Sequence, residues 1–146
     1  MKNILIALDL KSDQEKLLAQ GETFAKAFNA KLWLVHVAAP NPDFAGYEAG
    51  PQSVRDFRAE ELKAENKQLT ELTNQLASKA IDAEGLLIQG ATVETILEEA
   101  QKLNTDLIMI GHAEHSMVYK MLFGTQDTEL IKKSTIPVLV VPFDKD

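Results

Sequence analysis

Short apolar runs alternate with longer amphipathic segments along the chain. Five runs rich in branched aliphatic residues predict strands: Ile4 to Leu8, Leu32 to Val37, Leu86 to Ile88, Asp106 to Ile110 and Val138 to Val141. Within these runs apolar residues mostly follow one another without alternating with polar ones, which is typical of strands buried on both faces. We therefore expect a sheet with helices packed on either side of it.

The segments between these runs predict helices. The first is expected to begin at the capping residues Ser12 and Asp13 and to end at Asn29. Its apolar residues recur at helical spacing: Leu17, Gly21, Phe24, Ala25 and Phe28. A long, highly charged helix is expected to begin at Ser53, and its apolar stripe consists of Phe57, Leu62, Leu69, Leu72 and Leu76. Thr92 is expected to cap a third helix, and a short fourth helix contains Leu130 and Ile131.

Strands that alternate with helices predict parallel pairing through right-handed crossovers. The expected fold class is α/β: one domain, residues 1–146, forming a three-layer, doubly wound sandwich around a five-stranded parallel sheet. Proline and glycine break up the chain between residues 38 and 52, which predicts a long loop after the second strand.

The composition narrows the classes of function. The chain has 146 residues, no cysteine and a formal net charge of −7. Without cysteine there is no disulfide framework and no thiolate chemistry, and a cytoplasmic location is expected. An acidic domain repels nucleic-acid phosphates, so no nucleic-acid partner is expected. Neither a signal peptide nor membrane association is expected, because the first apolar run, Ile4 to Leu8, is far too short.

The candidate chemistry gathers where the first and fourth strands end. In an open doubly wound sheet, ligands bind beyond the carboxyl ends of the strands, at the point where the strand order reverses. Asp9 follows the first strand, and a long connection from Gly111 to Gly124 follows the fourth. This connection ends in Gly124 and Thr125 at a helix start, where free N–H groups favour a phosphate. Each glycine taken alone also fits an ordinary turn or a helix cap.

Several segments resemble the universal stress protein family. They include the C-terminal stretches IGHAE at residues 110–114, LFGT at 122–125 and KKSTIPVLVVP at 132–142. The opening run from Ile4 to Asp9 and the stretch from Leu34 to Val37 resemble the first two strands of that family. The likeness extends over the whole chain in the right order, and it implies a fold of the adenine nucleotide alpha-hydrolase-like type.

The resemblance also implies a site for an adenine nucleotide, ATP or AMP, with Mg²⁺ accompanying ATP. Members of the family that bind ATP share three glycines at fixed spacing followed by Ser or Thr, and here the positions are Gly111, Glu114, Gly124 and Thr125. Adenine would lie near Asp9 and the backbone of Val37, and the phosphates near the glycines. The complete set of implied site residues is Ala7, Leu8, Asp9, Val37, Ile110, Gly111, Glu114, Gly124, Thr125 and Gln126.

Two acids leave an alternative open. Glu114 occupies the middle glycine position, and Asp127 falls in the first turn of the helix that would face the phosphates. The alternative is an interaction protein of the same fold that binds no nucleotide. In either case the resemblance implies a homodimer made through the strand at residues 138–141, and an uncharged valine-rich edge strand favours such pairing.

Catalysis and a dedicated metal site are not expected. The chain has neither a Walker-type lysine after the glycines nor a Gly-x-Ser-x-Gly elbow, so at most trace ATP hydrolysis is expected. His112, Glu114 and His115 lie close in sequence but lack the spacing of a helical metal-binding pair. His36 lies within an apolar strand and is interpreted as a core or strand-end histidine, not as a catalytic base.

Overall fold

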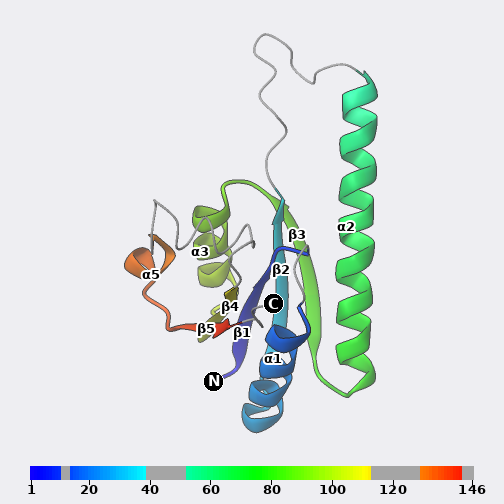
Figure 1. Ribbon diagram of the computed structural model, residues 1–146. Coiled ribbons are helices and arrows are strands. Elements are labelled where there is room, and N and C mark those ends of the chain that lie inside the picture. Colours follow the sequence, from blue (N-terminus) through cyan, green and yellow to red (C-terminus); the bar gives the residue numbers. More distant parts are fainter. Residues whose placement is uncertain (11–13, 39–51, 113–128, 143–146) are drawn as a thin grey trace.

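The computed structural model describes residues 1–10, 14–38, 52–112 and 129–142 (Figure 1). Its centre is one parallel sheet of five strands in the order β3-β2-β1-β4-β5. The strands are β1 (Asn3–Leu8), β2 (Lys31–Ala38), β3 (Ala83–Gln89), β4 (Leu107–His112) and β5 (Val138–Pro142). The α/β fold with a five-stranded parallel sheet is confirmed.

Helices lie against both faces of this sheet. Helices α1 (Glu15–Phe28) and α2 (Gln52–Ser78) cover one face, and α3 (Thr92–Lys102) and α5 (Glu129–Lys133) lie on the other (Figure 1). The side chains of β1 divide between the two layers according to the two-residue period of a strand. Ile4, Ile6 and Leu8 pack with the α1 and α2 side, whereas Leu5 and Ala7 pack with the α3 side. Burial on both faces, as predicted, therefore produces two cores that share one sheet.

Gly21 shows how closely α1 approaches the sheet. A Cβ atom built on Gly21 would lie 2.6 Å from the Cδ1 atom of Ile6, so a side chain there would force Ile6 to move. Leu17 and Ala25 are buried on the same face of the helix. Gly21 thus belongs to the apolar stripe because its lack of a side chain lets α1 pack closely against β1.

Several boundaries differ from the sequence prediction. Strand β3 extends over Ala83–Gln89, and β4 continues to His112, so Gly111 lies within a strand and not in the connection after it. Thr92 is the first residue of α3, and the N-cap position belongs to Ala91 without a side-chain capping bond. Sheet pairing explains the longer strands, because Gly111 pairs with Val141 and His112 with Pro142. Ser12 and Asp13 lie outside the described residues.

The apolar stripe predicted for α2 is only partly buried. Leu69 and Leu76 are buried, but Phe57 is 66% exposed. The N-terminal part of this 27-residue helix extends beyond the carboxyl ends of the strands, so it has no sheet beneath it (Figure 1). Phe28, at the end of α1, is also half exposed. Its ring packs edge-to-face on that of Phe24, with the two ring centroids 6.2 Å apart.

Candidate functional site

The central strand β1 ends earlier than both of its neighbours. Its last pairs are Leu8 with His36 of β2 and Ala7 with Ile110 of β4. Strand β2 continues to Ala38, and β4 continues to His112. We call this difference the register step: β1 ends at Leu8 while residues 37–38 and 111–112 continue the two flanking strands. The backbone of both flanking strands thus borders the point where the chain leaves β1.

The register step coincides with the reversal of strand order. The chain passes from β1 through β2 to β3 on one side, and then returns to place β4 beside β1 on the other. In doubly wound sheets this reversal is where ligands bind, at the carboxyl ends of the strands. The prediction that the first and fourth strands flank the reversal is confirmed.

Asp9 is the first residue beyond the end of β1. It is only 7% exposed, and its Oδ1 atom accepts a hydrogen bond from Nε2 of Gln14 at 3.0 Å. Gln14 is itself buried and immediately precedes α1. A carboxylate has acceptor capacity for several hydrogen bonds, so Asp9 can serve more than one donor at once. The arrangement holds an acceptor group at the reversal point.

The turn after Asp9 has an unusual backbone. Leu10 has a φ angle of 61°, in the left-handed region that residues with a side chain rarely adopt. Its carbonyl oxygen accepts a hydrogen bond from Nε2 of Gln68 in α2 at 3.3 Å. Contacts from outside the turn therefore support a conformation that costs about 1 kcal/mol by itself.

His36 joins the end of β1 to α2. Its Nδ1 atom lies 2.8 Å from the carbonyl oxygen of Leu8, and its Nε2 atom lies 2.7 Å from Oε2 of Glu65. The interpretation of His36 as a core or strand-end histidine is confirmed, because it is 7% exposed. Its contact with Glu65 could not be found in the sequence, since the two residues are 29 positions apart.

The structure brings together six of the ten predicted site residues. Ala7, Leu8 and Asp9 lie at the carboxyl end of β1, and Val37, Ile110 and Gly111 lie near the carboxyl ends of the adjacent strands β2 and β4. The side chains of Leu8 and Ile110 belong to opposite cores, so these two residues can offer a ligand only their backbone. The remaining predicted residues lie outside the described part of the chain: Glu114, Gly124, Thr125 and Gln126.

The described residues contain neither a cluster of metal ligands nor a membrane-spanning helix. Among the residues that the structure describes, no three His, Cys, Asp or Glu side chains gather as a metal site requires. Of the three candidates named from the sequence, His112 is described, whereas Glu114 and His115 lie outside the described residues. No helix in the described ranges has both the length and the apolar character needed to cross a bilayer.

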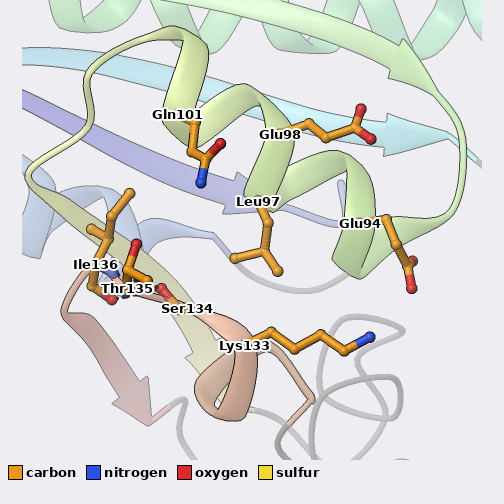
Figure 2. Close-up of a pocket in the computed structure, with 8 residues that line it drawn as sticks. All are labelled: Glu94, Leu97, Glu98, Gln101, Lys133, Ser134, Thr135 and Ile136. Atoms are coloured by element: carbon orange, nitrogen blue, oxygen red, sulfur yellow. Dashed lines mark hydrogen bonds between the residues drawn. The ribbon is translucent and has the colours of Figure 1, made fainter.

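Among the described residues, the hollows include two that lie away from the register step. One, of about 280 Å³, lies between α3 and the segment from α5 to β5, and its lining includes Leu97, Lys133 and Ile136. Figure 2 shows Leu97 pointing from α3 toward that segment, while the amino group of Lys133 extends away from Ile136. The other hollow lies where α1 and α2 end, and its lining includes Lys2, Lys26, Lys31 and Lys79. Neither hollow is lined by any of the ten predicted site residues.

Three of the four lysines of the second hollow interact with a carboxylate, an aromatic ring or a helix end. Lys79 pairs with Glu22 at 2.8 Å, and Lys31 pairs with Glu84 at 3.0 Å and lies over the Trp33 ring. Lys26 lies in the last turn of α1, where a cation interacts favourably with the helix dipole. These positive charges thus neutralise nearby carboxylates and a helix end.

Comparison with known proteins agrees with the fold and the sequence motifs. The model of the universal stress protein family matches residues 1–142. A universal stress protein of Thermus aquaticus is 30% identical over 142 residues, covering 96% of this chain and 98% of the relative. A universal stress protein A homolog of Coxiella burnetii is 31% identical over 141 residues, covering 96% of this chain and 95% of the relative.

Solved structures share the same fold. A universal stress protein from Archaeoglobus fulgidus in complex with dAMP has a TM-score of 0.63 and 19% identity, covering 97% of this chain and 98% of its own. A family member from Arabidopsis thaliana with AMP bound has a TM-score of 0.66 and 15% identity, covering 100% and 94%. A universal stress protein in complex with cAMP has a TM-score of 0.65 and 22% identity, covering 96% of each chain. From its sequence motifs, its parallel sheet and the match over residues 1–142, we conclude that this chain belongs to the universal stress protein family.

Proposed function

We propose that this universal stress protein binds an adenine nucleotide, ATP or AMP, at the register step between β1 and β4. The observation that carries the proposal is the position of Asp9, a buried acceptor at the point where the strand order reverses. Relatives of the same fold have AMP, dAMP or cAMP bound, which supports an adenine nucleotide as the ligand class.

The residues at the register step fit an adenine ring. The hydrogen-bonding edge of adenine carries an amino donor and ring-nitrogen acceptors. The Asp9 carboxylate supplies an acceptor, and the backbone of Val37, beyond the last pair of β1, supplies main-chain groups. Ala7 has a small side chain and leaves room for a flat ring beside Asp9. We propose that Asp9 and Val37 read the adenine edge.

The phosphate half of the proposed site belongs to the segment after β4. By the family's glycine pattern, Gly111, Gly124, Thr125 and the N–H group of Gln126 would hold the phosphates, with Mg²⁺ accompanying ATP. Glu114 would lie in the same loop and oppose the phosphate charge. The proposed preference is therefore for ligands with fewer phosphates, AMP over ATP.

Native mass spectrometry and calorimetric titration test this proposal. The purified protein is expected to carry a co-purified adenine nucleotide, or to bind added AMP and MgATP, and to bind GMP much more weakly. Absence of binding by all three nucleotides would favour the alternative, an interaction protein of the same fold that needs no nucleotide.

The proposed role is binding without appreciable turnover. It rests on the sequence, which offers no Walker-type lysine to stabilise a transferring phosphoryl group. ATP hydrolysis by the pure protein is expected to stay far below about 1 s⁻¹, the lower end of ordinary enzyme rates. Faster hydrolysis that tracks the protein through purification would contradict this role.

We also propose that two copies pair through β5. This strand is an edge of the sheet, and Val138, Leu139 and Val140 are only half-buried. An uncharged edge strand presents unpaired backbone groups to a second copy. Sedimentation is expected to give twice the monomer mass at micromolar concentration, and Val140→Lys is expected to give a monomer. A wild-type protein that stays monomeric at high concentration would contradict the pairing.

A further inference from the structure

Three elements meet at His36. The residue lies in β2, its Nδ1 atom faces the Leu8 carbonyl oxygen at the end of β1, and its Nε2 atom faces the Glu65 carboxylate of α2. The His36 side chain is 9% exposed and the Glu65 side chain 25% exposed, so water competes little for the first and modestly for the second. The β1 end that His36 contacts is followed directly by Asp9.

Both partner atoms of the imidazole are hydrogen-bond acceptors. A neutral imidazole has one N–H group and can satisfy only one acceptor, whereas an imidazolium has two. Carbonyl and carboxylate oxygens at 2.8 and 2.7 Å are both satisfied as acceptors when each ring nitrogen carries a hydrogen.

We propose that His36, charged and paired with Glu65, is a positioning residue for the nucleotide site and makes its affinity depend on pH. This inference rests on the proposed function, because it concerns the same Asp9. His36 acts on Asp9 through the backbone, by fixing the Leu8 carbonyl that precedes it. Gln68 of the same helix fixes the Leu10 carbonyl that follows it. Helix α2 therefore holds the turn on both sides of Asp9.

The charged groups around His36 define the sign of the pH effect. Glu65 is the carboxylate that α2 places against the ring, and Asp9 is the acid that follows β1. Further along α2, Arg58 and Glu61 pair with each other, and α1 opens with Glu15 and Lys16. Loss of the second proton leaves one N–H group, which stays with the stronger acceptor, the carboxylate. A nitrogen lone pair then faces the Leu8 carbonyl, and the turn that carries Asp9 loses its support on the Leu8 side.

Nucleotide affinity is therefore expected to fall as pH rises through the loss of that proton. The loss of one charge-assisted hydrogen bond predicts a decrease of about five- to tenfold. The measurement is calorimetric titration with AMP at a series of pH values, together with nitrogen NMR of the His36 ring over the same range. The two transitions are expected to coincide.

Four variants distinguish a role of His36 in positioning Asp9 from a role in stabilising the fold alone. His36→Asn keeps an amide donor near the place of Nδ1 but cannot titrate, so it is expected to retain affinity and lose the pH dependence. His36→Phe removes both donors and is expected to bind about tenfold more weakly at every pH. Glu65→Gln keeps an acceptor without its charge and is expected to move the loss of affinity to lower pH. Glu71→Gln makes the same charge change at an exposed position of the same helix and is the matched control.

The phosphate of AMP itself titrates near pH 6, so the wild type is compared with His36→Asn at each pH, which cancels the contribution of the ligand. Equal pH profiles for these two proteins would overturn the inference. It would also be overturned by a single ring hydrogen on His36 at the pH where AMP binds most tightly. If His36→Phe does not fold, the Asn variant and the NMR signals decide the outcome.

Failure of the proposed function is recognised separately. If the wild type binds no adenine nucleotide, the positioning of the turn is still measured by the backbone amide signals of Asp9 and Leu10. Shifts that follow the His36 proton would support the positioning, whereas shifts independent of it would overturn it.

Discussion

Two aspartates flank the adjacent strands β1 and β4 at opposite ends of the sheet. Asp106 precedes β4, is exposed, and accepts hydrogen bonds at Oδ2 from the backbone nitrogens of Lys2 and Asn3 at 2.7 and 2.9 Å. Asp9 follows β1, is buried, and accepts a hydrogen bond from the side chain of Gln14. Asp106 therefore accepts hydrogen bonds from the main chain at one end of the sheet, and Asp9 accepts one from a side-chain amide at the other.

The difference separates a structural carboxylate from a candidate ligand group. The amino end of the sheet is closed by main-chain bonds: Asp106 N donates to the oxygen of Asn3, and Lys31 N donates to the oxygen of Lys2. At the carboxyl end the flanking strands continue past β1, and α2 supports the turn around Asp9 through side chains. Burying a carboxylate is unfavourable unless it is partnered, and Gln14 is one partner that holds Asp9 at the register step.

The largest expected effect is on ligand binding at Asp9. Asp9→Ala removes the acceptor proposed for the adenine edge and is expected to weaken AMP binding about ten- to hundredfold. Calorimetry measures the affinity, and thermal unfolding checks that the fold persists. Asp106→Ala is the matched control, because it removes the same charge at the other end of the sheet. If both variants bind AMP like the wild type, adenine does not lie at Asp9.

The next largest effect is expected on ATP affinity at Glu114, the second acid assigned to the carboxyl end of the sheet. Glu114→Gly restores the family's middle glycine and is expected to tighten MgATP binding about tenfold, with a smaller gain for AMP. A carboxylate about 4 Å from a phosphate charge costs ~4 kcal/mol near a protein surface, and loop relaxation offsets part of this. Glu114→Gln is expected to recover the electrostatic part alone. An unchanged ATP affinity in Glu114→Gly would mean that this side chain points away from the phosphates.

A smaller effect is expected on stability at the amino end. Asp106→Ala leaves the N–H groups of Lys2 and Asn3 to water and is expected to lower the free energy of unfolding by about 1 kcal/mol, since the carboxylate is exposed. Denaturant unfolding measures this, with Asp82→Ala, another exposed acid of the same end, as control. A loss as small as that of the control would show that the two bonds do not stabilise the fold.

The smallest expected effect is the pH dependence of the contribution that Asp106 makes to the free energy of unfolding. Hydrogen bonds from the backbone of Lys2 and then of Asn3 lower the pKa of Asp106 below its ordinary value of 3.8. A lowered pKa in the folded state means that the contribution is complete above the unfolded value, near 3.8, and is lost as pH falls through the folded value. The stability difference between wild type and Asp106→Asn is therefore expected to shrink below about pH 4. A difference that stays constant down to pH 2 would contradict the shift.

Much of the fold could be predicted because it depends on local patterns. Each strand is a short apolar run, and the pattern predicted burial on both faces and the parallel α/β class. Asp9 follows the first strand directly, and this position predicted that it lies at the carboxyl end of the sheet, beside the candidate site. The phosphate loop was assigned through the family's glycine spacing, and its residues from Glu114 to Gln126 lie outside the described part of the chain.

The sequence by itself thus determined the strands, the two-faced core and Asp9 as the candidate acceptor, because each is encoded in consecutive residues. Only the tertiary structure decided that Gly111 is paired within a strand, that Phe57 lies on a helix end with no sheet beneath it, and that His36 meets Glu65. These features depend on the register between strands and on where a long helix crosses the sheet. Packing between residues far apart in the chain sets both, and no local pattern carries that information.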